Sequence, residues 1–257
     1  MYTHGHHEVV VRSHSQRTVA NSAAYLRPHL NSSQSLLDVG CGPGTITADL
    51  ADLVAHVTAI EPVPTALDIA RESTSGLANV TLEIADVHKL PYANDSFDVV
   101  HAHQVLQHVH SPVDALREMR RVSRDLVAAR DSDYAAFAWY PSSPDLDAWL
   151  ALYRQIARRN GGEPDAGRRL KSWAREAGFT EVTASASVWC WTTPEERESW
   201  GGMWADRIVR TAIADQAVEY GYATREDLAR ISRAWREWVT AEDGWFSILH
   251  GEILCRG

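Results

Sequence analysis

The segment LLDVGCGPGTI, residues 36–46, decides the fold, because three glycines alternate directly after an apolar run. The run predicts a buried strand, and the residues from Pro43 onward predict a helix. In the turn between them, Gly40 and Gly42 can adopt positive φ angles and, lacking Cβ atoms, let a ligand lie against the backbone. The segment therefore predicts a strand, a turn and a helix that bind a small molecule. A purely structural turn is the alternative.

Five short apolar runs alternate with helical patterns over residues 33–131. The runs cover residues 35–40, 56–61, 80–86, 97–103 and 126–131. Between the first two runs, Ile46, Leu50 and Leu53 recur at helical spacing, and Pro112 after a serine predicts a helix start before the fifth run. Strands that alternate with helices of this length predict parallel βαβ units, and therefore an α/β fold class.

The pattern changes after residue 145. Amphipathic stretches at 145–159 and 165–178 predict two helices. Strand-like runs at 182–191 and 245–254 then bracket a helical pattern over 194–242. We expect this last segment to be an insertion between two strands.

Composition limits the functions that the chain can have. Its 257 residues, 45% of them hydrophobic, can bury the core of a single domain covering 1–257. A net charge of −9 with no basic block argues against nucleic acid and membrane partners. No apolar run approaches about 18 residues and no signal peptide is recognisable, which predicts a cytoplasmic protein. Three scattered cysteines predict neither a disulfide framework nor a metal site.

Two acidic residues extend the ligand prediction beyond the glycines. Glu61 ends the second run about 20 residues after the glycines, where a carboxylate can accept both hydroxyls of a ribose. Asp86 ends the third run, where it can accept a hydrogen bond from an exocyclic adenine amine. No phosphate-binding G-x-x-x-x-G-K-[ST] motif is present, so a nucleoside is favoured over a triphosphate. Asp38 is better suited to orienting the glycine turn than to chemistry.

Three motifs carry a resemblance to a known family. DVGCGPG (38–44), AIEP (59–62) and IADVHKLPYANDSFDVVHAHQVLQHV (84–109) resemble successive motifs of the class I S-adenosylmethionine-dependent methyltransferases, type-11 or ubiquinone/menaquinone-biosynthesis-like branch. The resemblance covers residues 14–131. It implies a doubly wound, Rossmann-like sheet of seven mostly parallel strands in the order 3-2-1-4-5-7-6. The last strand is antiparallel, and the 194–242 segment lies between strands six and seven.

The resemblance also implies the cofactor site, for S-adenosylmethionine and its product S-adenosylhomocysteine. Gly40 and Gly42 would approach the methionine part, Glu61 the ribose, and Asp86 with Val87 the adenine. The full set of predicted cofactor-binding residues is His14, Arg17, Asp38, Gly40, Cys41, Gly42, Thr45, Glu61, Pro62, Asp86, Val87, His103 and Gln104.

Two parts of the chain depart from the family pattern or lie at its margin. A Pro-Gly-Gly type turn before strand five is missing, since the chain reads VSRDLVAARD (122–131). A shorter or differently built turn is therefore expected, and the residue at which that strand starts is left undetermined.

Residues 1–32 predict a helical cover over the cofactor, with His14 and Arg17 reaching the methionine carboxylate. A surface helix is the alternative.

The catalytic prediction follows from position at the end of strand four. A base is needed only if the acceptor starts protonated, and histidine suits that task. His103 is the first candidate and His108 the second; packing roles are the alternative. The 194–242 segment would form a lid, in which Trp200 and Trp204 either line the acceptor pocket or pack inward. Aromatic walls favour a small apolar or aromatic methyl acceptor.

Two other functions stay open. A nicotinamide-dependent oxidoreductase would also use an acid after strand two, but the glycine spacing differs from G-x-G-x-x-G and Asp86 would lack a role. The other is a protein that binds S-adenosylmethionine without methylating. The sequence leaves the acceptor atom and the oligomeric state undetermined.

Overall fold

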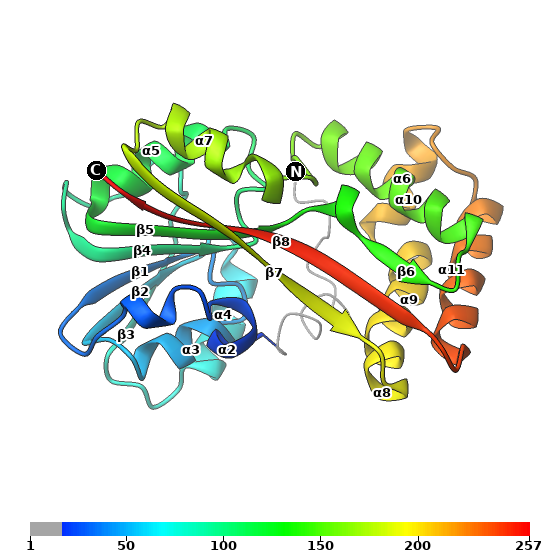
Figure 1. Ribbon diagram of the computed structural model, residues 1–257, viewed down its shortest axis with the longest axis horizontal. Coiled ribbons are helices and arrows are strands. Elements are labelled where there is room, and N and C mark those ends of the chain that lie inside the picture. The colour runs from blue at the N-terminus through cyan, green and yellow to red at the C-terminus, as the bar shows by residue number, and fades with distance from the viewer. Residues whose placement is uncertain (1–16) are drawn as a thin grey trace.

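The computed structural model describes residues 17–257, in which a central sheet carries helices on both faces (Figure 1). Five parallel strands form its first part, in the order β3-β2-β1-β4-β5. They are β1 (Ser35–Val39), β2 (His56–Ile60), β3 (Val80–Glu83), β4 (Phe97–His103) and β5 (Ser123–Ser132). β8 (Trp245–Arg256) pairs antiparallel with β5, and β7 (Glu181–Trp191) pairs along β8. The predicted doubly wound α/β fold is confirmed, with β7 and β8 as strands six and seven. A short β6 (Ala138–Tyr140), which pairs with the start of β8, was not expected.

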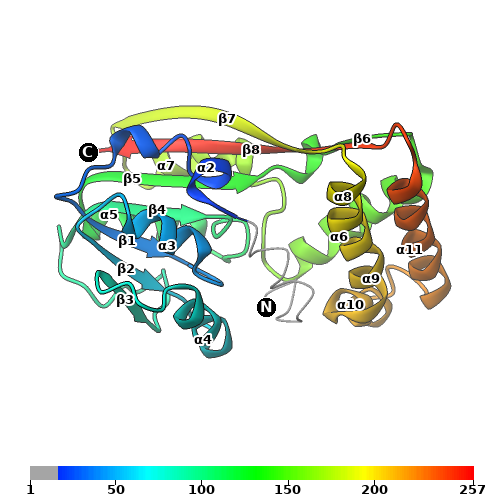
Figure 2. The same ribbon diagram turned by 90° about the horizontal axis from the view of Figure 1, so that it is seen from below.

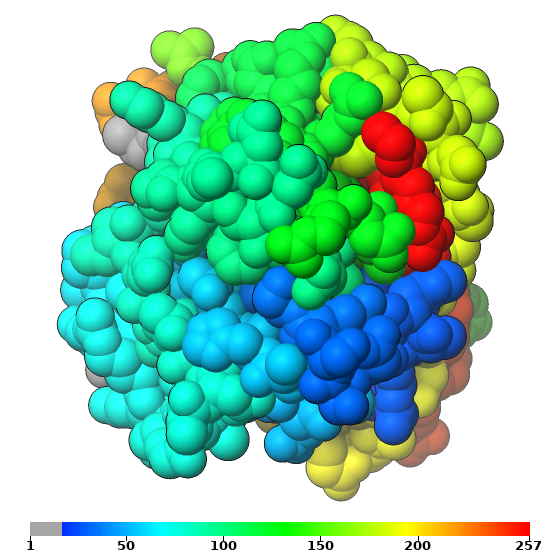
Figure 3. Space-filling model, turned by 90° about the vertical axis from the view of Figure 1, so that its left-hand side faces the viewer, coloured from blue at the N-terminus to red at the C-terminus, as the bar shows by residue number. Residues whose placement is uncertain are grey.

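Alternation along the strands gives the sheet two apolar faces. In β1, Leu36 packs with the cluster that includes α2 (Val19–Ser22) and α3 (Thr45–Ala51), whereas Leu37 packs with the cluster on the opposite face. That second cluster includes buried residues of α5 (Pro112–Val122) and α7 (Leu170–Glu176). The remaining core helix, α4 (Pro64–Ser73), lies beside α3 (Figure 1). Figure 3 shows the molecule from the side of the amino ends of the parallel strands. On this side the segment that leads into β1 (blue) lies beside the C-terminal residues (red).

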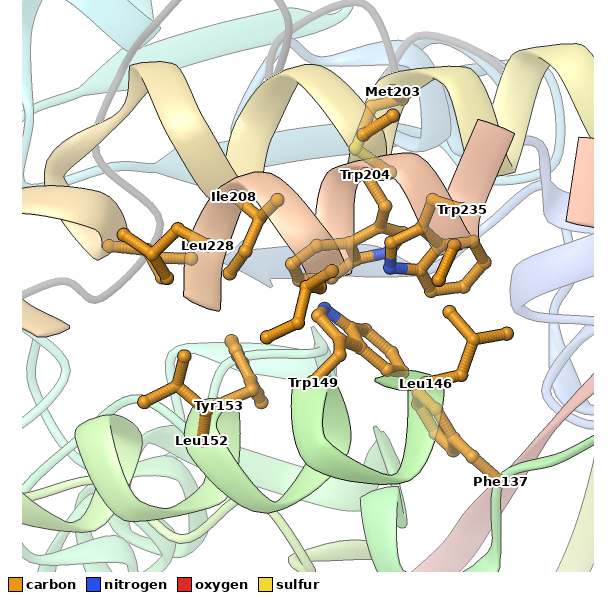
Figure 4. Close-up of a cluster of buried hydrophobic side chains, with 14 of the residues drawn as sticks. Phe137, Leu146, Trp149, Leu152, Tyr153, Met203, Trp204, Ile208, Leu228 and Trp235 are labelled. Carbon is orange, nitrogen blue, oxygen red and sulfur yellow. The ribbon is translucent and has the colours of Figure 1, made fainter. Parts of the chain in front are cut away.

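A third apolar cluster belongs to a group of helices that we call the helical unit. It consists of α6 (Pro144–Arg159), α8 (Pro194–Arg197), a π-helical turn (Glu198–Gly202), α9 (Met203–Arg210), α10 (Ala212–Glu219) and α11 (Arg225–Thr240). Its core contains Trp149, whose ring centroid lies 4.7 Å from that of Trp204 and 4.8 Å from that of Trp235, both edge to face (Figure 4). Phe246 of β8 belongs to the same cluster, which anchors the unit to the sheet.

The β7–β8 ribbon places the helical unit at one end of the sheet. Ser132, the last residue of β5, pairs with His250, but β7 and β8 continue to pair as far as Trp191 and Phe246. The ribbon therefore extends beyond the carboxyl end of β5, and the helices that follow β7 lie on that side (Figures 1 and 2). Ligands of open α/β sheets bind at the carboxyl ends of the strands.

Several element boundaries differ from those expected. β3 ends at Glu83 rather than residue 86, and α3 begins at Thr45 rather than Pro43. α5 ends at Val122 and β5 begins at Ser123, so the departure from the family pattern is a junction with no intervening turn. Within residues 17–32, only the four-residue α2 and a 3₁₀ turn (Arg27–His29) are helical, which is less than a continuous helix. No helix within residues 17–257 is long and apolar enough to cross a membrane.

Candidate functional site

The register of the central strands brings three predicted residues to one edge of the sheet. Val39 pairs with Ile60 of β2 and with Ala102 of β4. The residues that directly follow Val39, Ile60 and Ala102 are Gly40, Glu61 and His103, respectively. Residues separated by up to 63 positions in the sequence therefore gather at the carboxyl ends of β1, β2 and β4.

The first two glycines of the turn both have positive φ, 68° at Gly40 and 54° at Gly42, but their surroundings differ. A Cβ atom on Gly40 would lie 2.6 Å from Cγ2 of Val105, so packing within the protein requires glycine there. A Cβ atom on Gly42 would meet no described protein atom within 4 Å. The backbone of Gly42 is therefore open to a ligand.

Glu61 is hydrogen-bonded to the same turn. Its Oε2 accepts a hydrogen bond from the Gly42 N–H (3.2 Å), and its Oε1 accepts one from the Val63 N–H (3.3 Å). Burial raises the pKa of Glu61, and the two N–H donors oppose that rise. The carboxylate is held beside the glycine turn, and the adjacent Pro62 is exposed.

Asp38 lies beneath the turn, buried inside β1. Its Oδ2 accepts a hydrogen bond from the Thr47 hydroxyl (2.7 Å), and its Oδ1 lies 3.0 Å from Nδ1 of His101. The carboxylate thus connects β1, α3 and β4, which fits an orienting role. Two further predicted residues lie close by: Thr45 is the first residue of α3, and burial raises the pKa of the half-buried Cys41.

Asp86 lies in a turn after β3 and not at the end of a strand. Its exposed carboxylate accepts hydrogen bonds from the His88 N–H (2.9 Å) and lies 2.7 Å from His88 Nδ1. These bonds lower the pKa of Asp86 despite some desolvation. Val87 is buried beside it. Since β3 is the parallel neighbour of β2, this turn follows the same edge of the sheet as Glu61.

The two candidate bases are both electrically neutral. His103 is 6% exposed, and neither of its ring nitrogens has a hydrogen-bond partner within the described chain. Burial, followed by the charges of Arg17 and Arg130, holds its pKa well below the ordinary value. Burial and Arg17 lower the pKa of His108 to about 3. A neutral imidazole can accept a proton, and the lowered pKa of each ring reduces its strength as a base.

Gln104 connects the N-terminal segment to β8. It has a positive φ of 54°, which is uncommon outside glycine, and its N–H donates to the Arg130 carbonyl (2.7 Å). Its Oε1 accepts a hydrogen bond from Arg17 Nη2 (2.7 Å), and its Nε2 lies 2.9 Å from His250 Nε2. Arg17 is thereby fixed next to the end of β4. The other predicted N-terminal residue, His14, lies outside the described residues.

Sequence reasoning missed a buried ion pair next to His103. Arg130 of β5 is 1% exposed, and its Nε donates to Ser187 Oγ (3.1 Å) and Glu252 Oε1 (3.3 Å). Its guanidinium carbon lies 4.8 Å from the centroid of the Trp189 ring. The one available signal was an arginine at the end of the apolar run LVAARD. Its partners on β7 and β8 could not be foreseen.

The tryptophans fall into two groups. Trp204 is 1% exposed inside the core of the helical unit, as the packing alternative predicts. Trp200 is partly buried and stacks on Trp191 of β7, with ring centroids 4.4 Å apart. Trp189, also partly buried, lies 5.8 Å from His103 between ring centroids. An aromatic surface therefore runs from the end of β4 toward the helical unit.

These residues fit an adenosine-type cofactor with a methionine tail. The open backbone of Gly42 permits close approach, and the Glu61 carboxylate beside it can accept hydrogen bonds from hydroxyls. The buried, unbonded nitrogens of His103 lie at the same edge. Metal ligands are not gathered in this part of the molecule: residues 17–257 contain no group of three or more His, Cys, Asp or Glu side chains arranged to hold an ion.

Comparisons with known proteins agree with this geometry. The family model described as a methyltransferase domain matches residues 37–126. An uncharacterized methyltransferase of Schizosaccharomyces pombe is 30% identical over 98% of this chain and 95% of its own length. The probable methyltransferase ltbC of Aspergillus luteorubrus is 26% identical over 98% of this chain and 96% of its own.

One solved structure shows the shared fold with a ligand. The complex of Haemonchus contortus phosphoethanolamine N-methyltransferase 2 with phosphomonomethylethanolamine and S-adenosylhomocysteine has a TM-score of 0.56 to this chain. The two are 16% identical over 91% of this chain and 52% of that one. At this identity the likeness establishes the fold alone.

Proposed function

Because the chain belongs to the class I S-adenosylmethionine-dependent methyltransferases, we propose that it methylates a small apolar or aromatic molecule bound between the sheet and the helical unit. The observation that carries this proposal is the proximity of His103 to Trp189, whose rings are 5.8 Å apart. An aromatic wall beside the end of β4 favours an acceptor with an apolar surface. Family membership also favours a methyltransferase over the nicotinamide-dependent alternative.

In this proposal the glycine turn and two carboxylates hold the cofactor. Gly40 and Gly42 would lie against its methionine part, Glu61 would accept the ribose hydroxyls, and Asp86 with Val87 would contact the adenine. When bound, S-adenosylmethionine supplies a methyl group that its sulfonium already activates. The protein's own contribution is then alignment, which can supply about 7–11 kcal/mol in well-oriented reactions.

His103 would receive the acceptor's proton when the acceptor starts protonated. Its ring is neutral, so the ring nitrogen that carries no proton can accept one, and no hydrogen bond among the described residues fixes which of the two nitrogens this is. The helical unit would act as the lid that excludes water, since it lies at the carboxyl ends of the strands. Trp200 of that lid would face the acceptor together with Trp191 of β7, on which it stacks.

Turnover with a panel of acceptors tests the function. Purified protein is incubated with S-adenosylmethionine and with matched pairs of small molecules that do or do not carry an aromatic or alkyl body. S-adenosylhomocysteine and methylated product are quantified by mass spectrometry. We expect both to accumulate with apolar or aromatic acceptors and not in a Gly42→Val variant. Tight cofactor binding without turnover on any acceptor would instead favour a protein that binds S-adenosylmethionine without methylating.

A further inference from the structure

A row of polar side chains crosses the sheet where apolar residues are the rule. His103 of β4 pairs in register with Arg130 of β5, and Arg130 pairs with Glu252 of β8. Ser185 of β7 pairs with Glu252 and continues the row. All four lie on the face that α2 and α3 cover, because they alternate with residues of the opposite apolar cluster such as Ala129 and Ile253.

The Glu252 end of this row is fully bonded. Its Oε2 accepts a hydrogen bond from the Ser185 hydroxyl (2.8 Å), and its Oε1 accepts from the Ser187 hydroxyl (2.5 Å) and from Arg130 Nε. Arg130 therefore contacts Glu252 through Nε alone and not through the two-pronged geometry that guanidinium and carboxylate groups favour.

The two terminal nitrogens of the Arg130 guanidinium are buried and form no hydrogen bond with the described residues. Nη1 and Nη2 have no hydrogen-bond partner within residues 17–257, although the side chain is 1% exposed. The hydroxyl of Tyr25 is likewise buried without a partner, and its raised pKa, due to burial and then to Glu252, keeps it protonated. Buried donors are normally satisfied, and each unsatisfied one calls for an explanation. Here the unsatisfied groups are donors next to a candidate catalytic residue.

The surroundings of Arg130 combine a cation with an aromatic surface. The Trp189 ring lies against its guanidinium at 4.8 Å and against the His250 ring at 4.4 Å. Trp189 is held in place by a hydrogen bond from its Nε1 to the Asn21 carbonyl (2.6 Å). Arg17 and Arg130 both disfavour protonation of His103 and His250, so the positive charges of both arginines act on these two rings.

We propose that the acceptor is an organic acid whose carboxylate binds to the unbonded edge of Arg130 beside His103, with its apolar body along Trp189. A carboxylate offers two oxygens that match the unbonded Nη1–Nη2 edge, and its charge is opposite to that of Arg130. This inference rests on the proposed function and adds the chemical class of the acceptor. Its alternative is a purely structural ion pair that ties β5 to β7 and β8.

Binding of simple probes tests the inference. Protein saturated with S-adenosylhomocysteine is titrated in a calorimeter with benzoate, with the neutral isostere benzamide, and with inorganic phosphate. We expect benzoate to bind at least ten-fold more tightly than either of the other two. Equal binding of benzamide would show that Arg130 does not select a carboxylate, and equal binding of phosphate would overturn the organic acid as the ligand.

Variants separate this role from a structural one. The double change Arg130→Met with Glu252→Gln removes both charges of the pair at once, so no buried charge is left alone. We expect it to keep its affinity for S-adenosylhomocysteine and to lose the preference for benzoate. Arg124→Met removes an exposed arginine of the same strand and serves as the matched control. If the double variant fails to fold, Arg130→Lys, which keeps the charge but not the paired donors, should bind benzoate at least three-fold more weakly.

The outcomes for the proposed function differ from those for the carboxylate site. Failure of the unaltered protein to bind S-adenosylhomocysteine would refute the proposed function itself. Normal cofactor binding with no preference for benzoate, or with a preference that survives the loss of Arg130, would refute the carboxylate site alone.

Discussion

Asp38 and His101 face each other across the two central strands, with Oδ1 and Nδ1 3.0 Å apart, and both side chains are buried. The same carboxylate accepts the Thr47 hydroxyl of α3, so one buried group connects the strand before the glycine turn to the helix after it. The shape of the turn therefore depends on a contact between residues 63 positions apart.

Replacing Asp38 tests that dependence. Asp38→Ala leaves His101 and Thr47 buried without their partner, and we expect the free energy of unfolding to fall by about 1–3 kcal/mol. Urea unfolding followed by circular dichroism measures the change. Asp98→Ala, which removes a carboxylate on the opposite, amino-terminal side of the sheet, is the control for cofactor affinity. Asp38→Ala should weaken cofactor binding more than Asp98→Ala does, and equal affinities would contradict the orienting role.

Removing the carboxylate of Glu61 should weaken S-adenosylmethionine binding. Two ribose hydroxyls would lose a charged acceptor, with an expected cost of roughly 1.5–3 kcal/mol in Glu61→Ala. Isothermal titration calorimetry measures it, with Glu72→Ala on the exposed surface of α4 as the control. Because Glu61 also accepts the Gly42 N–H, a Glu61→Gln variant is needed to separate the two effects. An unchanged affinity in folded Glu61→Ala would remove Glu61 from the site.

A side chain on Gly42 should abolish cofactor binding while most of the fold persists. A β-branched residue tolerates positive φ poorly and would project toward the ligand. Gly76→Val is a closely matched control, because Gly76 also has a positive φ and a Cβ atom there would also meet no described atom within 4 Å. Both variants should lose similar stability in thermal unfolding, but only Gly42→Val should lose binding. If Gly42→Val binds normally, the glycines form a structural turn and nothing more.

The two tryptophans of the helical unit should respond differently to leucine. Trp204→Leu leaves a cavity among buried aromatic rings and should cost about 2–4 kcal/mol of stability. Trp200→Leu removes a partly buried ring that stacks on Trp191, so a smaller loss of stability and a larger change in acceptor affinity are expected. Thermal unfolding and acceptor KM measure the two effects. The lid proposal fails for Trp200 if its substitution changes only the melting temperature.

Stability should fall as the pH decreases from 6.5 toward 3, in part because of His108. Its pKa is about 3 in the folded protein, well below the ordinary value of 6.5, so in this window the unfolded chain binds more protons. Proton uptake then favours unfolding, whereas above pH 6.5 both states are neutral at this residue. Urea unfolding at pH 5 and pH 7 measures the slope. His108→Phe should reduce the loss at pH 5, whereas His29→Phe, at an exposed position, should not.

The sequence alone was enough to predict that Gly40, Gly42 and Glu61 meet at one edge of the sheet. The positions of Gly40, Gly42 and Glu61 depend on local features, namely where a buried strand ends and which residues follow it. Strands that alternate with helices must run parallel, and the ends of parallel strands meet at one edge. The family resemblance implied the strand order and the cofactor. The structure confirms the strand order, and the comparisons confirm the family and the cofactor.

Only the tertiary structure decided what lies next to that edge. The partners of Arg130 are 57 and 122 positions away on β7 and β8, and they meet it through the register of an antiparallel ribbon that no local pattern reveals. Helical spacing likewise predicted that Trp200 and Trp204 share a face, but not that one lies inside a core and the other stacks at its margin. Periodicity determines which side of an element is apolar, whereas the packing of distant elements determines what that side contacts.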